Sequence, residues 1–199
     1  LMVWYDKTVE ALDTEQFDVI CELKYDGLAV ALTYLDGRLT TGATRGNGSV
    51  GEDVTHNVRT VKSVPLQLFD NPSLLEVRGE IYIPLSKFEK INRKRISEGD
   101  EPFSNPRNTA AGSLRQLDAK IAYERELDVF MYGIGHGEGI GYMETQWEQF
   151  QYLKQLGFKI NPHNKLVRGL DSIIEYCEYW REEKHNLDYD CDGIVLKVD

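Results

Sequence analysis

The chain has 199 residues, of which 41% are hydrophobic and 28% are charged, so it can bury a substantial core and is neither disordered nor fibrous. Its net charge of −10 excludes nucleic-acid binding through overall charge, and any such contact must be local. The three cysteines lack C-x-x-C spacing, which argues against a zinc site or a disulfide framework. The longest apolar runs have about five residues, far fewer than a membrane span needs. We therefore expect a cytoplasmic protein without a membrane partner.

The chain is predicted to begin with a short amphipathic helix within residues 1–16. From Phe17 the apolar period changes to two, which predicts a strand. Side chains two positions apart point the same way in a strand, so Glu22 and Lys24 share one face. Two charged groups are thereby placed side by side near the end of this strand.

A β-hairpin is predicted next, from residues 28–34 and 38–44. The connecting pair Asp36-Gly37 is favoured in two-residue hairpin turns because both positions tolerate positive φ. A glycine-rich loop, residues 45–53, follows the second strand.

Within that loop, residues 46–51 match the G-x-G-x-x-G fingerprint of dinucleotide-binding Rossmann folds. The fingerprint functions only in a β-α-β unit with parallel strands and with an acidic residue about 20 positions further on. Here the loop follows a hairpin strand, and residues 71–75 contain no acid. We therefore reject the Rossmann interpretation.

Helix and strand signals continue to the end of the chain. Capping-box spacings, Ser or Thr followed three residues later by Glu, predict helices at residues 86–99, 145–157 and 172–186. Further strands are predicted at residues 74–83, 127–134 and 193–198. Hairpins with separate helices, rather than β-α-β alternation, predict an α+β fold with mainly antiparallel sheets and flanking helices.

Lys24 is the first candidate for chemistry, since it stands at a strand end just before the Asp26-Gly27 turn. A lysine in this position is ordinarily a solvated charge. The functional alternative is a nucleophile, which requires desolvation or neighbouring cations to lower the pKa of the amine. Arg45, Arg78 and Lys197 could supply such cations, although each alone is as well explained as a charge on a strand surface.

Taken together, these clusters resemble a known superfamily. Lys24-Tyr25-Asp26-Gly27 matches the K-x-D-G element of the nucleotidyltransferases, which include DNA ligases, RNA ligases and capping enzymes. Longer strings resemble the adenylation domain of bacterial NAD-dependent DNA ligases; these strings are residues 21–30, 44–53, 75–80, 103–118 and 192–197. The resemblance implies an ATP-grasp-like nucleotidyltransferase ligase core over residues 17–199, within one adenylation domain over residues 1–199.

The resemblance also implies an activity. Lys24 would attack the α-phosphate of NAD, release nicotinamide mononucleotide and become lysyl-AMP. The AMP would then pass to the 5′-phosphate of nicked double-stranded DNA during DNA replication and repair. Lys197 and Arg45 would be catalytic cations, and Asp26 and Asp192 would organise the lysine and the Mg²⁺ that the family uses.

The family's other binding roles fall on residues of this sequence. Glu80 would accept the ribose hydroxyls, and Glu22 would contact adenine. Tyr132 would stack on the base, although a core tyrosine is the alternative. Arg107 and Arg115 would face DNA or the pocket, unless they merely bridge loops.

A basic run between Lys87 and Arg95 is either a DNA-facing surface or a solvated helix face, and the sequence does not decide.

We find no counterpart in this sequence of the family's upstream nicotinamide-binding domain, nor of its downstream oligonucleotide-binding fold, zinc, helix-hairpin-helix and terminal domains. We therefore expect a monomeric adenylation domain that does not seal nicks alone. The alternatives are an ATP-dependent polynucleotide ligase core and a non-catalytic nucleotide- or DNA-binding module. The combination of Lys24, Glu80 and Lys197 argues against the module, since binding alone needs no nucleophile.

Overall fold

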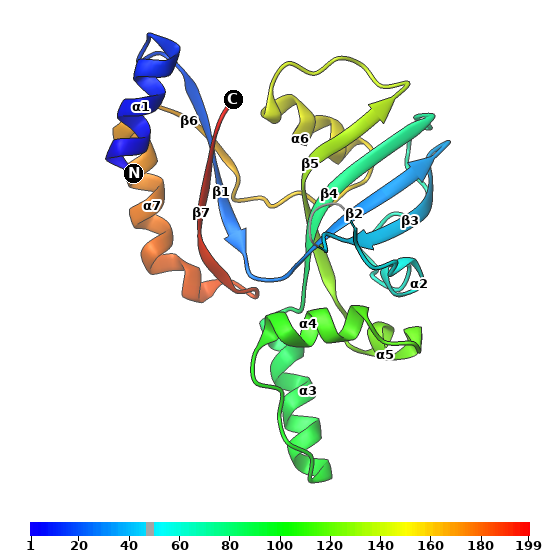
Figure 1. Ribbon diagram of the computed structural model, residues 1–199. Helices are drawn as coiled ribbons and strands as arrows, with labels where there is room; N and C mark the ends of the chain where they lie inside the picture. Colours follow the sequence, from blue (N-terminus) through cyan, green and yellow to red (C-terminus); the bar gives the residue numbers. More distant parts are fainter. Residues whose placement is uncertain (47–49) are drawn as a thin grey trace.

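The computed structural model describes residues 1–46 and 50–199. Its strands form two antiparallel sheets (Figure 1). Every strand pairing that it describes is antiparallel, which confirms the predicted α+β class. The three-stranded sheet has the order β6 (Lys165–Arg168), β1 (Asp18–Tyr25), β7 (Cys191–Val198). The four-stranded sheet has the order β3 (Arg38–Thr44), β2 (Leu28–Leu35), β4 (Leu74–Tyr82), β5 (Asp128–Glu138).

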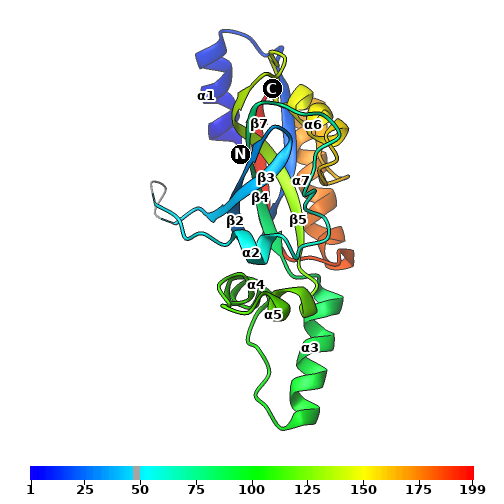
Figure 2. The ribbon, with the colours of Figure 1, turned by 90° about the vertical axis from the view of Figure 1, so that its right-hand side faces the viewer.

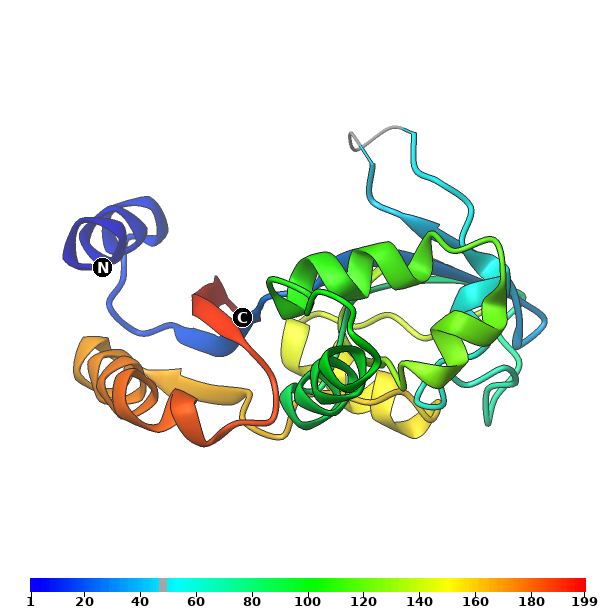
Figure 3. The same ribbon diagram turned by 90° about the horizontal axis from the view of Figure 1, so that it is seen from below.

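Helices flank both sheets. Figures 1 and 2 show α1 and α7 beside the three-stranded sheet, α6 beside β5, and α3 projecting away from the sheets. Seen from below, α3, α4 and α5 lie in front of the strands (Figure 3). No helix within the described part of the chain is long and apolar enough to cross a membrane. The helices are α1 (Met2–Leu12), α2 (Thr55–Val58), α3 (Leu85–Glu98), α4 (Pro106–Leu114), α5 (Ala119–Glu124), α6 (Gln146–Gln155) and α7 (Leu170–Glu183), followed by a 3₁₀ turn, η1 (Lys184–Asn186).

Strand β1 lies between two hydrophobic cores. Its residues Val19, Cys21 and Leu23 pack into a cluster with α7, whereas Ile20 packs into the larger cluster beneath the four-stranded sheet. This alternation confirms the predicted period of two. The face of β1 that bears Glu22 therefore points into the space between the two sheets.

The chain crosses from one sheet to the other at the K-x-D-G motif. Strand β1 ends at Tyr25, and β2 begins at Leu28 in the four-stranded sheet. A Cβ atom on Gly27 would lie 2.3 Å from the backbone oxygen of Ile81, so no side chain fits there. Glycine at this position allows Lys24 to stand at the junction of the two sheets.

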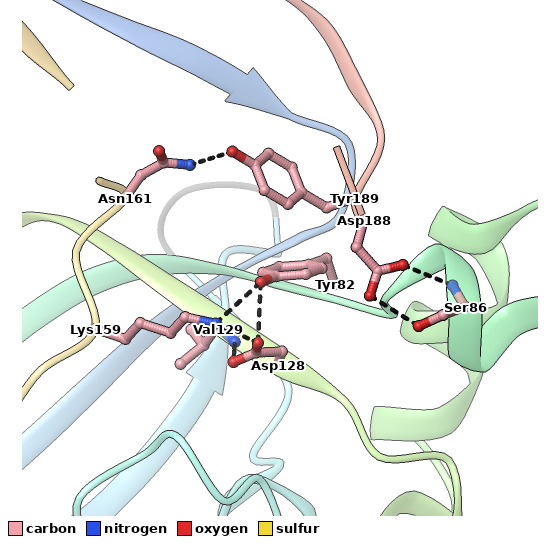
Figure 4. Close-up of polar contacts among 8 residues, drawn as sticks. All are labelled: Tyr82, Ser86, Asp128, Val129, Lys159, Asn161, Asp188 and Tyr189. Carbon is pink, nitrogen blue, oxygen red and sulfur yellow. Dashed lines mark hydrogen bonds and ion pairs between the residues drawn. The ribbon is translucent and has the colours of Figure 1, made fainter. Parts of the chain in front are cut away.

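Helix α3 begins in a way that the sequence does not predict. We expected a capping box at Ser86, but the helix starts at Leu85 after Pro84 and has no side-chain cap of its own. The carboxylate of Asp188 accepts hydrogen bonds from the backbone N–H and the hydroxyl of Ser86, at 2.7 and 2.8 Å (Figure 4). A residue just before β7 thus caps α3 from outside the helix.

A polar network lies beside this cap (Figure 4). The Tyr82 hydroxyl donates to the Asp128 carboxylate at 3.0 Å, and the Lys159 ammonium pairs with the same carboxylate. The amide of Asn161 donates to the Tyr189 hydroxyl at 2.8 Å. The first bonds join β4 and β5 to the segment at Lys159, and the last joins Asn161 of that segment to a residue two positions before β7.

Other element boundaries also differ from the predictions. The capping box of α6 at Thr145 and Glu148 is confirmed. The one predicted at Ser172 is wrong, because α7 begins at Leu170 after Gly169. The Asp36-Gly37 turn is confirmed, with φ of 47° and 71° at its two positions. The elements α2, α4, α5 and β6 were not predicted.

Candidate active site

The strands of both sheets and α4 enclose a pocket of about 540 Å³. Its lining comes from segments far apart in the sequence, because β1 and β7 contribute one wall and β2, β4 and β5 the other. Eight candidate site residues line it: Glu22, Lys24, Arg45, Glu80, Arg107, Arg115, Tyr132 and Lys197. The candidates Asp26, Arg78 and Asp192 do not, and Arg78 pairs with Glu76 at 3.2 Å.

Lys24 and Asp192 form an ion pair beside this pocket. The Lys24 ammonium donates to both oxygens of the Asp192 carboxylate, at 2.7 and 2.8 Å. Both side chains are about half exposed, at 52% and 46%. The β1–β7 register shifts between Lys24 and Tyr25, and this bulge lies where the two charges meet.

Glu22 is the deepest charged group in the pocket, with 3% of its side chain exposed. The Lys197 ammonium pairs with it at 2.6 Å and also donates to the backbone oxygen of Tyr132 at 3.3 Å. Burial raises the pKa of Glu22, and the charge of Lys197 opposes that rise. Glu22 and Lys197 thus act as one coupled pair at the base of the pocket.

Glu80 has a strongly perturbed carboxyl group. Burial raises its pKa to about 7, and the nearby charge of Asp26 contributes to the rise. The charges of Arg107 and Lys24, with a hydrogen bond from the Gly27 backbone, hold the pKa down in part. A carboxyl group with this pKa is poised to change its charge near neutral pH.

Tyr132 is aimed into the pocket by a β-bulge. Arg78 pairs with Gly133 and Gly79 pairs with Met131, so Tyr132 is the extra residue between them. It is partly buried against the aromatic cluster around Phe130 and lines the pocket. Tyr132 therefore packs partly on the core and also lines the pocket, and its stacking on a base stays a prediction.

The α4 arginines reach the pocket and also bridge loops. Arg107 pairs with Asp26 at 2.9 Å, and Arg115 pairs with Glu52 at 2.6 Å. Glu52, in the loop after β3, was not among the predicted site residues. Its position within the string of residues 44–53 could have indicated it. Arg45 lines the pocket from the other end of that loop, of which residues 47–49 lie outside the described part.

The basic run on α3 is largely neutralised by acids. Lys87 pairs with Glu126 at 2.7 Å, Lys94 with Glu98 at 3.8 Å, and Arg95 with Asp100 at 3.7 Å. These contacts favour the solvated face over a DNA-binding surface.

Asp26 and Asp192 are both engaged by cations, namely Arg107 and Lys24. Among the described residues, no group of three or more His, Cys, Asp or Glu side chains could hold a metal ion. Carboxylates are ligands that Mg²⁺ accepts, with waters and phosphate oxygens completing its coordination, so a metal at these residues stays a prediction.

Comparison with known proteins agrees with this arrangement. A family model described as NAD-dependent DNA ligase adenylation domain matches residues 1–199. The DNA ligase of Thermotoga neapolitana is 48% identical over 198 residues, which are 99% of this chain and 28% of that protein. The DNA ligase of Dehalococcoides mccartyi is 48% identical over 200 residues, covering 100% of this chain and 30% of that protein. The chain thus spans under a third of either relative.

Among solved structures, mycobacterial DNA ligase D complexed with ATP and MES has a TM-score of 0.51 at 13% identity. The match covers 91% of this chain and 48% of that one, and it shows a shared fold. Since the family model spans all 199 residues and the pocket gathers the nucleotidyltransferase motifs, the chain belongs to the family of NAD-dependent DNA ligase adenylation domains.

Proposed function

We propose that this chain transfers AMP from NAD to Lys24 as the first step of nick sealing in DNA replication and repair. The supporting observation is the convergence of Lys24, Glu80 and Lys197 on one pocket, although they come from three different strands. A binding module would have no need of the lysine at the pocket mouth. Residues 1–199 act in this proposal as one monomeric adenylation domain.

The adenosine half of NAD fits the polar groups of the pocket. Glu22, at the base, accepts a hydrogen bond from the exocyclic amine of adenine. Tyr132 stacks on the base, and its partial burial restricts the ring before the ligand arrives. Glu80 accepts hydrogen bonds from the ribose hydroxyls.

The covalent step requires Lys24 to leave Asp192 and lose one proton to solvent. Its free amine attacks the α-phosphorus, a P–N bond forms, and the P–O bond to nicotinamide mononucleotide breaks, with the electron pair leaving on that oxygen. The nitrogen then gives a second proton to solvent and becomes the neutral phosphoramidate. Arg45 and Lys197 stabilise the negative charge that develops on the phosphate oxygens. Asp26 and Asp192 would hold Mg²⁺, which supplies further charge neutralisation at the phosphates when bound.

The second half-reaction needs an acceptor at the same pocket. An oxygen of the 5′-phosphate of nicked DNA attacks the phosphorus of lysyl-AMP, a P–O bond forms, the P–N bond breaks, and the amine of Lys24 leaves with a proton taken from solvent. Arg107 and Arg115 bind phosphates there through bidentate guanidinium contacts. Both arginines lie in exposed positions on or just after α4, so a duplex can reach them. Their present partners, Asp26 and Glu52, are exchanged for phosphate oxygens.

The choice of nucleotide donor provides the test of this proposal. The chain is incubated separately with NAD and with ATP, and its intact mass is measured over hours. We expect a covalent AMP adduct from NAD and little from ATP. An adduct formed only from ATP would favour the ATP-dependent ligase, and no adduct from either donor would favour a binding module.

A further inference from the structure

A second cavity, of about 390 Å³, lies beside the start of α3 and the start of β5. None of the described residues lines both this cavity and the candidate active site. Three lysines line it, and they come from segments far apart in the sequence: Lys62 after α2, Lys87 in α3 and Lys159 after α6. We call this space the lysine cavity, and the proposed function uses none of these three residues.

One carboxylate is shared among lysines at this cavity. The Lys87 ammonium lies 2.7 Å from the Glu126 carboxylate, and the Lys90 ammonium lies 4.0 Å from it. The hydrogen bond from Lys87, together with the charges of Lys90 and Lys62, lowers the pKa of Glu126. A single negative charge therefore lies near three positive charges.

The backbone of Glu126 is strained. Its φ is 50°, in the left-handed region that residues other than glycine, asparagine and aspartate seldom adopt. A glycine would adopt this conformation without strain after the end of α5. The chain instead has an acid there, and its carboxylate meets the lysines. Strain of this kind is typical of sites that bind ligands.

Positive charge remains in excess after these pairs are formed. Asp128 is the other carboxylate that lines the cavity, and it is engaged by Lys159 and by the Tyr82 hydroxyl (Figure 4). Four lysines against two carboxylates leave a surplus of two positive charges. The Lys62 ammonium lies 5.6 Å from the centre of the Tyr123 ring rather than against a carboxylate. This local excess contrasts with the net charge of −10 on the chain.

A hydroxyl group in the cavity wall is also without a partner. Ser63 lines the cavity, its hydroxyl oxygen is buried, and no described residue completes a hydrogen bond with it. Buried polar groups are seldom left in this state. A ligand with several acceptor oxygens would supply the missing partner, and phosphate groups carry such oxygens.

We propose that the lysine cavity binds a short chain of phosphate groups, which displaces the Glu126 carboxylate from Lys87 and pairs with Lys62. Lysine binds phosphate as a point charge. A chain of phosphates carries several negative charges, so it competes well against one carboxylate for the same lysines. A cavity of about 390 Å³ admits such a chain, whereas a double helix is too wide to enter.

A titration of the ¹⁵N-labelled chain with inorganic tripolyphosphate, followed by NMR at low salt without divalent metal, tests this inference. The backbone amides of Ser63 and Leu127 should shift and saturate, and their titration gives the affinity of this cavity alone. Lys62→Met should weaken that affinity about fivefold or more, because one cation is lost while the exposed side chain contributes little to the fold. Lys94→Met is the matched control, since Lys94 pairs with Glu98 outside the cavity and should not matter.

The competing carboxylate provides a test in the opposite direction. Glu126→Gln should tighten tripolyphosphate binding about threefold or more, because the lysines no longer hold a negative charge of their own. Glu98→Gln removes the same charge from a neighbouring position on α3 and should leave the affinity unchanged. Equal tightening in both variants would indicate a response to overall charge and would overturn the inference.

Two sources present the same phosphate chain, and a second titration distinguishes them. ATP that shifts the Ser63 and Leu127 amides with higher affinity than tripolyphosphate would identify a nucleotide, with its base near the exposed Tyr123 ring. Equal or weaker binding of ATP would identify the inorganic chain. Both results support a phosphate-chain site.

Three results would overturn the inference. The first is an absence of saturable shifts at Ser63 and Leu127, including shifts confined to Arg45 and Glu80 in the candidate active site. The second is an equal effect of Lys62→Met and Lys94→Met. The third is a loss of affinity for nicked duplex DNA in Lys62→Met as large as the loss for tripolyphosphate, since this would assign the lysines to DNA.

Discussion

The Lys24 ammonium donates to both carboxylate oxygens of Asp192, at 2.7 and 2.8 Å, across the junction of β1 and β7. In this arrangement the proposed nucleophile, Lys24, pairs with the carboxylate that we propose as a ligand of Mg²⁺. The two roles of Asp192 are therefore exclusive, and Lys24 must turn toward the nucleotide before the carboxylate can face a metal.

Substitution of Asp192 tests this exchange. Asp192→Asn should weaken Mg²⁺ binding to the AMP-loaded chain about tenfold, because an amide is a poorer ligand than a carboxylate for this ion. Adenosine affinity should stay the same, since adenosine carries no phosphate to bind the metal. Titration calorimetry measures both, and equal Mg²⁺ affinity in variant and parent would exclude Asp192 as a ligand.

Removal of Lys197 should destabilise the fold as well as slow catalysis. Lys197→Ala leaves Glu22 buried without its 2.6 Å partner. We expect a loss of about 2 kcal/mol, since an unpaired buried charge keeps its desolvation penalty. Thermal unfolding measures this loss as a drop of roughly 6 °C.

The double variant separates the two effects. Glu22→Gln removes the buried charge, so Lys197→Ala in that background should unfold near the temperature of the Glu22→Gln single variant. Slow lysyl-AMP formation should persist there, because the cation near the phosphates is still missing. Additive losses of stability would show that the ion pair contributes little.

Glu80 should make nucleotide binding depend on pH. Its pKa of about 7 means that the carboxylate, the form that we propose accepts hydrogen bonds from the ribose hydroxyls, becomes dominant above neutrality. Adenosine affinity should rise roughly tenfold from pH 6 to pH 8, and Glu80→Gln should abolish the rise. Adenosine is the suitable probe because it has no phosphate to titrate. Affinity that falls over this range would indicate that the protonated acid is the binding form.

Stability should follow the opposite trend. The pKa of Glu80 is higher in the folded chain, about 7, than its ordinary value of 4.5, so between these values the folded chain binds more protons than the unfolded chain. The contribution of Glu80 to the free energy of unfolding is therefore present at low pH and is lost as the pH rises through about 7. Denaturant unfolding from pH 5 to 8 should show a smaller decline in Glu80→Gln, and identical pH profiles would contradict the shifted pKa.

The parts of this structure predicted from sequence are those with local signals. The alternation of β1, the Asp36-Gly37 turn and the Thr145 capping box depend on residues close together in the chain, and all are confirmed. The pocket residues other than Tyr132 were chosen because each belongs to a short string, and their roles stay predictions. They gather around one cavity because the chain crosses from one sheet to the other at Gly27.

What the sequence did not predict depends on distant partners. Strand β6 has four residues and is defined by its pairing with β1. Helix α4 lacks an apolar stripe, and its only local signal is Asn105 as N-cap with Pro106 after it. The bulge at Tyr132 and the Asp188 cap on α3 each require a neighbouring element to be in place.

The central claim is that Lys24 is the nucleophile, and peptide mapping by mass spectrometry after incubation with NAD tests it most directly. The account predicts AMP attached to the peptide that contains Lys24. Lys24→Arg should keep the charge opposite Asp192 and change the free energy of unfolding by less than about 0.5 kcal/mol, because the side chain is 52% exposed, yet form no adduct. AMP on another residue, or an adduct that persists in Lys24→Arg, would contradict it.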